Sequence, residues 1–389
     1  MEPIEIPKTS RTSLIALIVG ILGLILSLVA FYANSEHFFH SYLVAFAFWT
    51  SIALGGLFLT FLHYLTGAVW SVVLRRIFES FMAVLPFMAL FLIPVLLGMY
   101  ELYHWTHAEA IEQDILLQQK SPYLNIPFFV VRAILFFVIW SVFARVLYHL
   151  SIKNDWTGDA TLLKKARRIS PLVAILFAIT LSFAAFDWLM SLDAHWYSTI
   201  FGVYYFSGST VATIALLILF VVMFDKAGFL KNLISIEHYH DLGKLLFTFT
   251  VFWAYIAFSQ YFLIWYANIP EETIWFAHRW EGSWKSVSLL LVIGHFVLPF
   301  FVLMMRSTKR NLGVLMFMSL WLLFMHLVDM YWLVMPTLFH HDVHLSWIDV
   351  APFLGIGGIF VWLVYVQLSR NSLVAINDPK LNESINHRM

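Results

Sequence analysis

The chain has 389 residues, carries no net charge at neutral pH and contains no cysteine. It is 61% hydrophobic and 12% charged with a mean hydropathy of +0.82, whereas soluble domains average about 25% charged residues, so a water-soluble fold is excluded and an integral membrane protein is predicted. Zero net charge argues against nucleic acid as a partner, and the missing thiols exclude iron–sulfur ligation, covalent c-type haem and disulfides within this chain.

Apolar runs of about 20 residues predict ten membrane-spanning helices. The runs are too long for strands and do not alternate, so we expect an all-α integral membrane fold. The first run follows Lys8 and Arg11 and is longer than a signal-peptide core, so we expect a spanning helix there rather than a cleaved signal. The predicted spans lie near residues 12–33, 41–65, 78–99, 127–150, 170–189, 198–224, 243–266, 285–305, 312–334 and 348–369.

Basic residues are distributed unequally between the two sets of loops. Of the 23 Lys and Arg residues, 18 fall in the N-tail, in the loops after spans 2, 4, 6 and 8 with their flanking helix ends, and in the C-tail. The opposite loops hold only Lys120, Arg279 and Lys285, while Arg132 and Arg145 lie inside the fourth span. Because cytoplasmic loops are enriched in Lys and Arg, this asymmetry predicts that both termini are cytoplasmic.

Spans 2–5 and 6–9 form two four-helix sets of equal orientation, and a short segment is weakly similar in the two sets. We therefore expect two sets of four spans and two further helices inside a single polytopic membrane domain, with short helices in the loops 101–126 and 151–169. The expected boundaries are 1–389 for the domain, about 40–150 plus 170–189 for the first set, about 198–334 for the second set, and 12–33 and 348–369 for the two further helices.

Acids and an imidazole gather where the fifth span meets the outer face. Asp187, Asp193 and His195 lie within one short segment there, and Arg132 in the fourth span lies on the side that otherwise avoids positive charge. A charged side chain in a membrane span needs a partner, so we expect Arg132 to pair with an acid such as Asp187. The three outer groups are candidates for the outer end of a proton path.

A second polar pair lies inside the ninth span. His326 and Asp329 are three residues apart and therefore share one helix face. Three interpretations fit the pair: a structural hydrogen bond between helices, a step in a proton relay or a quinone pocket, or a haem site in which His326 and His295 are the two ligands. No catalytic residue, and no metal or cofactor ligand, is assigned from the sequence.

Three segments carry a resemblance to a known family. They are FDWLMSLDAHWYSTIFGVYYFSG at 186–208, HDLGKLLFTFTVFWAYIAFSQYFLIWYANIPEETIWF at 240–276, and HLVDMYWLVMP at 326–336. They resemble a membrane subunit of bacterial alternative complex III, a family within the polysulfide-reductase (NrfD-like) membrane-anchor superfamily. The length and the ten expected spans are similar to the shorter of the two homologous ten-helix membrane subunits of that complex.

The resemblance implies a multi-pass subunit of a respiratory quinol:cytochrome c oxidoreductase in the bacterial inner (cytoplasmic) membrane. It implies that spans 2–5 form bundle one and spans 6–9 form bundle two, two four-helix bundles with flanking helices at 12–33 and 348–369. It implies no cofactor in this chain, with quinone or menaquinol as the lipid-soluble substrate and with iron–sulfur clusters and c-type haems on partner subunits. The implied partners are a paralogous quinol-oxidising membrane subunit, a periplasmic iron–sulfur subunit, c-type cytochrome subunits, a terminal oxidase and membrane lipids. Two alternatives stay open: a secondary transporter, and a b-haem quinol oxidase membrane subunit.

Overall fold

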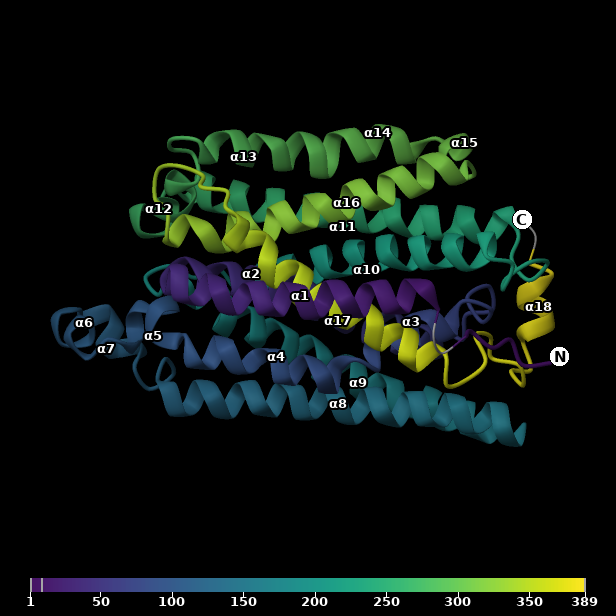
Figure 1. Ribbon diagram of the computed structural model, residues 1–389. Coiled ribbons are helices and arrows are strands. Elements are labelled where there is room, and N and C mark those ends of the chain that lie inside the picture. Colours follow the sequence, from purple (N-terminus) through teal and green to yellow (C-terminus); the bar gives the residue numbers. More distant parts are fainter. Residues whose placement is uncertain (1, 8–9, 388–389) are drawn as a thin grey trace.

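The computed structural model describes residues 2–7 and 10–387, and over these residues it is helical with no strand (Figure 1). Ten segments are long and apolar enough to cross a membrane, so the predicted number of spans and the all-α class are confirmed. Lys8 and Arg388, two of the basic residues counted in the tails, lie outside the described residues.

The spanning segments extend beyond the apolar runs at their charged ends, because a helix continues past the hydrocarbon into the interfacial region. They are α1 (Arg11–Ala33), α2 (Ser35–Thr66), α3 and α4 (Arg75–Met82 and Leu85–Leu97), α8 (Ile126–Thr157), α9 with η2 (Thr161–Trp188 and Met190–Leu192), α10 (Phe201–Lys226), α11 (Ile236–Ala267), α13, η3 and α14 (Trp284–Leu290, Leu291–Val297 and Leu298–Met304), α16 with η4 (Leu312–Val334 and Met335–Thr337) and α17 (Trp347–Leu368). The short helices are α5 (Met99–Leu102), η1 (His104–Thr106), α6 (Ala108–Gln113), α7 (Ile115–Lys120), α12 (Pro270–His278), α15 (Arg306–Lys309) and α18 (Leu381–Ile385).

Only one of the two loops expected to hold short helices does so. The segment 101–126 contains η1, α6 and α7, as predicted. In the segment 151–169 the prediction was wrong, because α8 and α9 themselves extend into it and leave only a short break between them. Gly158 ends α8 with a φ of +67°, a left-handed conformation that favours glycine and stops a helix.

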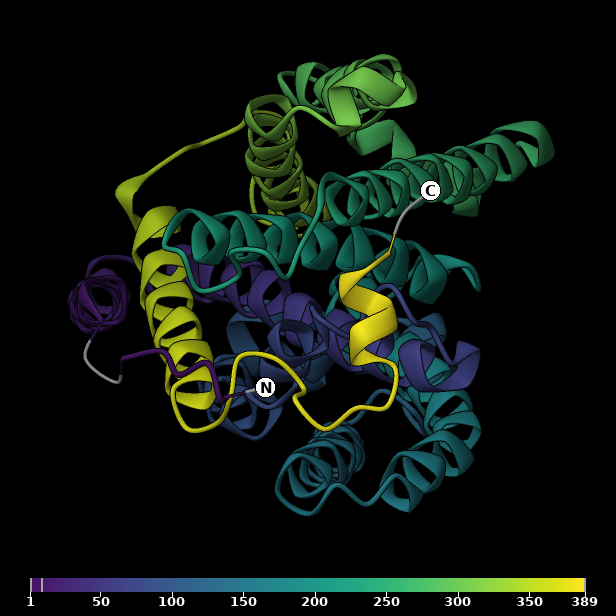
Figure 2. The same ribbon diagram turned by 90° about the vertical axis from the view of Figure 1, so that its right-hand side faces the viewer.

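Two helices form the centre of the molecule. The apolar windows of α2 and α10 are 89% and 83% buried, whereas that of α1 is 22% buried, so α2 and α10 are surrounded by protein and α1 exposes an apolar surface suited to lipid. Helix α2 packs against α3, α4, α8, α9, α16 and α17 as well as α10, and α10 packs against α9, α11 and α16. The end-on view shows α1 and α17 flanking one side of this assembly (Figure 2).

The two ends of the bundle differ in what they carry. Helices α6, α7 and α12 lie at one end, and α18 lies at the other, together with the first and last described segments of the chain (Figure 1). An even number of spans requires the chain to finish on the side where it began.

A seam of glycines joins α1 to α17. A Cβ added at Gly23 would stand 2.6 Å from the Cα of Gly355, and one added at Gly20 would stand 2.7 Å from the backbone nitrogen of Ile359. Both distances are below any normal carbon contact, so the two backbones approach each other more closely than a side chain allows. Close approach of this kind lets helices associate in lipid, where the hydrophobic effect supplies no attraction between them.

We predict that Gly23→Ala lowers the free energy of unfolding by roughly 1–3 kcal/mol, because the added methyl group meets backbone that has no way to rotate aside. The matched control is Gly313→Ala near the start of α16, where only Asn311 lies near the added atom. We expect this control to be neutral or to stabilise by up to about 1 kcal/mol through helix propensity. Thermal unfolding of the purified proteins measures both changes. Equal stabilities of the two variants would contradict the close packing of α1 against α17.

Candidate functional site

An ion pair joins α8 to α9 at the end of the molecule that carries α6 and α7. Arg132 Nε donates to Asp187 Oδ2 at 2.8 Å, and Arg132 Nη2 donates to Asp187 Oδ1 at 3.0 Å. The hydroxyl of Tyr123 donates to Asp187 Oδ1 at 2.9 Å, and its carbonyl accepts from Arg132 Nη1 at 2.9 Å. The predicted pairing of Arg132 with Asp187 is therefore confirmed. Because both carboxylate oxygens are already bonded, Asp187 is suited to holding α8 and α9 together.

The other two outer candidates have partners of their own. His195 Nε2 lies 2.5 Å from Asp114 Oδ2, and Asp193 Oδ1 accepts from the backbone nitrogen of His195 at 3.3 Å. The hydrogen bond from His195 holds the pKa of the Asp114 carboxyl below its usual range. The structure thus places Asp193 and His195 in one turn tied to the α6–α7 loop, and no described hydrogen bond joins either side chain to Asp187.

The predicted pair in the ninth span lies where α2, α10, α11 and α16 meet. Asp329 is fully buried; it accepts from the Tyr204 hydroxyl through Oδ1 and from Trp253 Nε1 through Oδ2 at 3.1 Å. His326, one turn earlier on the same face of α16, has its Nε2 3.0 Å from Ser51 Oγ. We call these five residues the Asp329 cluster. It brings a carboxylate, a phenol, an imidazole and a hydroxyl to one place deep in the protein.

The absence of a side chain at Gly208 on α10 makes room for the Asp329 cluster. A Cβ at Gly208 would stand 3.0 Å from His326 Nδ1 and 3.6 Å from Asp329 Oδ2. That Nδ1 atom is buried and has no hydrogen-bond partner among the described residues. Leaving such an atom unpaired costs about 1–3 kcal/mol, so His326 retains one free bonding position beside the carboxylate.

Span eight contains a π-helical turn, η3, and His295 lies within it. Pro299 explains the turn, because proline has no N–H to continue the helical bonding and its ring crowds the preceding turn. In π-helical bonding the carbonyl of Gly294 would take its hydrogen from residue 299. The indole of Trp321 on α16 donates to that carbonyl instead, at 2.7 Å. The backbone is thereby satisfied, and the π-helical turn is fixed against α16.

His295 itself is fully buried and has no hydrogen-bond partner for either ring nitrogen among the described residues. Its ring stacks on Trp253 with a centroid separation of 3.8 Å and an interplanar angle of 22°. The same indole donates to Asp329, so Trp253 lies between the unpaired imidazole and the carboxylate. His295 therefore extends the polar region of the Asp329 cluster toward η3.

A cavity of about 620 Å³ opens beside the Asp329 cluster. Its walls come from α10, α11, α12, α13, η3 and α16, and they are mostly aromatic and aliphatic. Tyr204 and Trp253, which bond Asp329, form part of its lining, and Gln260 and Ser288 contribute polar groups to the same wall. Asp329 is thus one side chain away from a space that accepts an apolar ring or chain.

Arg279 is a buried cation that stands out in the sequence only as an exception to the charge asymmetry of the loops. It is 2% exposed and donates to the carbonyls of Trp332 at 3.2 Å, Leu333 at 3.0 Å and Trp275 at 2.9 Å. Desolvation by burial lowers the pKa of Arg279 to about 9, so it remains charged at neutral pH. Two of these carbonyls belong to the last turn of α16, and Arg279 therefore caps the negative end of the helix that carries Asp329.

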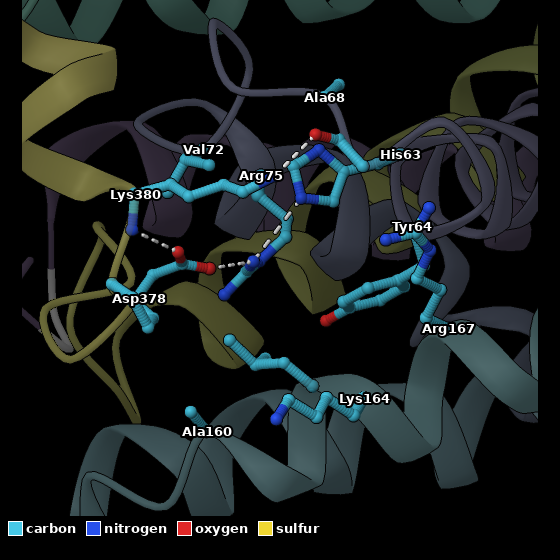
Figure 3. Close-up of a pocket in the computed structure, with 13 residues that line it drawn as sticks. His63, Tyr64, Ala68, Val72, Arg75, Ala160, Lys164, Arg167, Asp378 and Lys380 are labelled. Carbon is cyan, nitrogen blue, oxygen red and sulfur yellow. Dashed lines mark hydrogen bonds and ion pairs between the residues drawn. The ribbon is translucent and has the colours of Figure 1, made fainter.

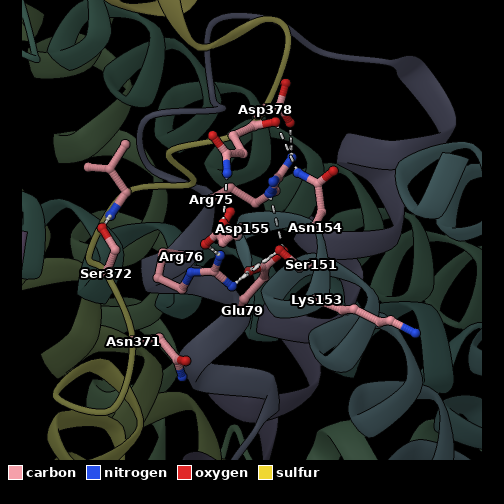
Figure 4. A network of polar contacts seen from close by, with 12 residues as sticks. Arg75, Arg76, Glu79, Ser151, Lys153, Asn154, Asp155, Asn371, Ser372 and Asp378 are labelled. Carbon is pink, nitrogen blue, oxygen red and sulfur yellow. Dashed lines mark hydrogen bonds and ion pairs between the residues drawn. The ribbon is translucent and has the colours of Figure 1, made fainter. Parts of the chain in front are cut away.

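A second charged network lies at the opposite end of the molecule, near α18 (Figure 4). Arg75 Nη1 donates to Asp378 at 2.5 Å, Arg76 Nη1 donates to Glu79 at 2.7 Å, and Arg76 Nη2 also bonds Asp155. Arg75 and Arg76, counted from sequence as markers of a cytoplasmic loop, are in fact buried at the start of α3. The C-terminal segment supplies Asp378, so this network joins the end of the chain to α3 and α8.

No protein-family model matches the chain, and no curated protein matches it. The resemblance to alternative complex III therefore rests on the three quoted segments.

For the outer ion pair we predict that Asp187→Asn and Arg132→Gln each lower the free energy of unfolding by about 3–5 kcal/mol, because each leaves one buried charge without its partner. The double variant should lose less than the sum of the single losses, since two amides retain hydrogen bonds without an unpaired charge. Chemical or thermal unfolding of the three proteins measures the coupling. Glu109→Gln, an exposed change nearby, is the control; strictly additive single losses would show that the pair is not coupled.

Proposed function

We propose that the chain is an integral membrane subunit of a quinol:cytochrome c oxidoreductase resembling bacterial alternative complex III, in the place of the shorter of its two ten-helix subunits. One observation supports this most directly: the three resembling segments, far apart in the sequence, supply most of the Asp329 cluster and its surroundings. The first contains Tyr204 and Gly208, the second Trp253, and the third His326 and Asp329. A family likeness concentrated on a buried polar site favours a shared role for that site.

The packing of the helices supports the corresponding architecture. We propose that α2, α3–α4, α8 and α9 form one four-helix bundle, and that α10, α11, the segment α13–η3–α14 and α16 form the other. Within each set the helices pack on one another, and α2 and α10 contact each other between the sets. Helices α1 and α17 then flank the pair. With the termini in the cytoplasm, α6, α7 and α12 face the periplasm and offer a surface to periplasmic iron–sulfur and c-type cytochrome subunits.

The Asp329 cluster is suited to proton transfer in this proposal. Oxidation of a quinol to a quinone releases two electrons and two protons, and the protons need a carboxylate, phenol or imidazole within hydrogen-bond reach. Tyr204 links the 620 Å³ cavity to Asp329, and His326 offers a further nitrogen on the same face. The electrons pass to iron–sulfur clusters and c-type haems of partner subunits, because both kinds of centre are attached through cysteine and this chain has none.

Co-purification tests the assembly. We expect an affinity-tagged chain, extracted from bacterial membranes in mild detergent, to bring with it subunits that show c-type haem absorption and contain iron–sulfur clusters. A second ten-span subunit should accompany them. Recovery of the chain alone, with substrate uptake in proteoliposomes, would instead establish a transporter, and haem absorption in the isolated chain would establish a b-haem subunit.

For the site we predict that Asp329→Asn in the assembled complex lowers quinol:cytochrome c turnover by about tenfold or more, because the relay loses the group that accepts and releases the proton. Tyr204→Phe removes one of the two donors to Asp329 and should lower turnover less. Asp342→Asn changes an exposed acid of an outer loop and is the control. Turnover is measured alongside subunit composition and thermal stability. Full turnover by both cluster variants in intact complexes would show that the Asp329 cluster does not transfer the protons.

A further inference from the structure

A pocket of about 210 Å³ lies at the end of the molecule near α18 (Figure 3). Four parts of the chain form it: the end of α2, the turn that leads into α3, the first turns of α9, and the C-terminal segment before α18. Its lining includes Gly67, Arg75, Leu163, Lys164, Arg167 and Asp378. The pocket is separate from the Asp329 cluster and from the 620 Å³ cavity beside it.

Positive charge predominates in the lining. Four cations, Arg75, Lys164, Arg167 and Lys380, face a single carboxylate, Asp378. Arg75 already binds that carboxylate at 2.5 Å. Within the described residues, Lys164 and Arg167 form no ion pair with an acid. The pocket therefore holds more positive charge than the chain itself neutralises.

Two of these cations converge on one turn. Gly67 ends α2 with a φ of +61°, and its carbonyl accepts from Lys380 Nζ at 2.7 Å. A Cβ at Gly67 would stand 3.5 Å from Lys380 Nζ and 3.7 Å from Arg167 Nη1. Like charges brought this close to one point repel each other unless an anion lies within reach of both.

A buried donor of Arg75 gives a second, independent observation. The Arg75 side chain is 1% exposed, and its Nη2 atom has no hydrogen-bond partner among the described residues. Its Nη1 atom is shared between Asp378 and His63 Nε2, the latter at 3.3 Å. A charged N–H left unpaired in a buried place is unfavourable, so an acceptor oxygen in the pocket would complete the bonding of this guanidinium.

The beginning of α9 forms the opposite wall. The carboxylate of Asp159 accepts from the backbone nitrogen of Thr161 at 2.9 Å and already caps this end of the helix. This wall therefore contributes the side chains of Lys164 and Arg167 to the pocket rather than free backbone donors. Leu163, in the first turn of α9, gives this wall an apolar surface beside the cations.

We propose that this pocket binds the phosphate headgroup of an anionic glycerophospholipid. The phosphate accepts from Arg75 Nη2, Lys164 and Arg167, and the glycerol and upper acyl carbons lie along Leu163. The lipid source follows from position, because the pocket lies where α2 ends and α9 begins, at the boundary of two spanning helices. Basic pockets at this depth are recognition sites for anionic lipid headgroups. The proposal is independent of the respiratory assignment.

The test uses the full chain, purified and delipidated in a neutral detergent, and titrated with phosphatidylglycerol or phosphatidylcholine. Bound lipid is counted by native mass spectrometry, and thermal stabilisation is followed in parallel. We expect saturable binding of phosphatidylglycerol that Lys164→Gln/Arg167→Gln weakens by roughly 25-fold, or about fivefold for each basic residue removed. The matched control is Lys165→Gln/Arg168→Gln, which removes equal charge from exposed neighbours outside the pocket; its affinity should stay within about twofold of the parent value.

Three outcomes would overturn the proposal. Equal weakening in both double variants would mean that diffuse surface charge attracts the lipid. Equal binding of phosphatidylcholine would mean that the negative charge of the headgroup does not determine binding. Stabilisation by inorganic phosphate at the concentration that suffices for phosphatidylglycerol would assign the pocket to a soluble anion.

Discussion

A polar atom inside the hydrocarbon of a bilayer has no water to bond, so it must find its partner within the protein. This constraint organises the buried charges of the chain. Arg132 and Asp187 form two hydrogen bonds with each other, and Tyr123 adds one hydrogen bond to each of them. Arg279 forms no ion pair with a carboxylate among the described residues and donates to three carbonyls, two at the end of α16 and one in α12. In each case the polar group fixes the position of the helices that carry its partners.

Several buried side-chain atoms among the described residues do not meet this constraint, and those at two sites bear on function. His295 and the Nδ1 atom of His326 flank Asp329, and Arg75 Nη2 belongs to a residue that lines the pocket near α18. An unpaired buried group is unfavourable on its own, so it persists where something from outside the chain completes it or where a proton moves through it. Groups whose hydrogen bonds are complete, such as Arg132 and Asp187, hold the helices together. The unpaired atoms at the two sites are available for chemistry or for binding.

The sequence was sufficient to predict features that depend on local composition or on the need of a buried charge for a partner. A helix needs about 20 apolar residues to cross the hydrocarbon of a bilayer, so the apolar runs alone were enough to predict all ten spans. The pairing of Arg132 with Asp187 was also accessible, because a cation in a span needs an acid and few acids lie in the spans. Asp378 was not accessible as a partner of Arg75, since 303 residues separate the two and no pattern links them. Tyr204 and Trp253 were hidden for another reason: they are two among 38 Phe, 16 Trp and 16 Tyr residues, and only the fold shows which of these rings face a carboxylate.

Helix α2 explains how the separate polar sites coexist in one bundle. Near one end Ser41 donates to Asp349 at 2.6 Å, in the middle Ser51 meets His326 at 3.0 Å, and near the other end His63 meets Arg75. At a rise of about 1.5 Å per residue these contacts lie roughly 15 Å and 18 Å apart along the helix. Such gaps are too long for a direct hydrogen bond, so no hydrogen bond links the sites directly although one rigid element positions them all. The apolar window of α2 is 89% buried, and close packing around the helix opposes a shift of one site relative to the others.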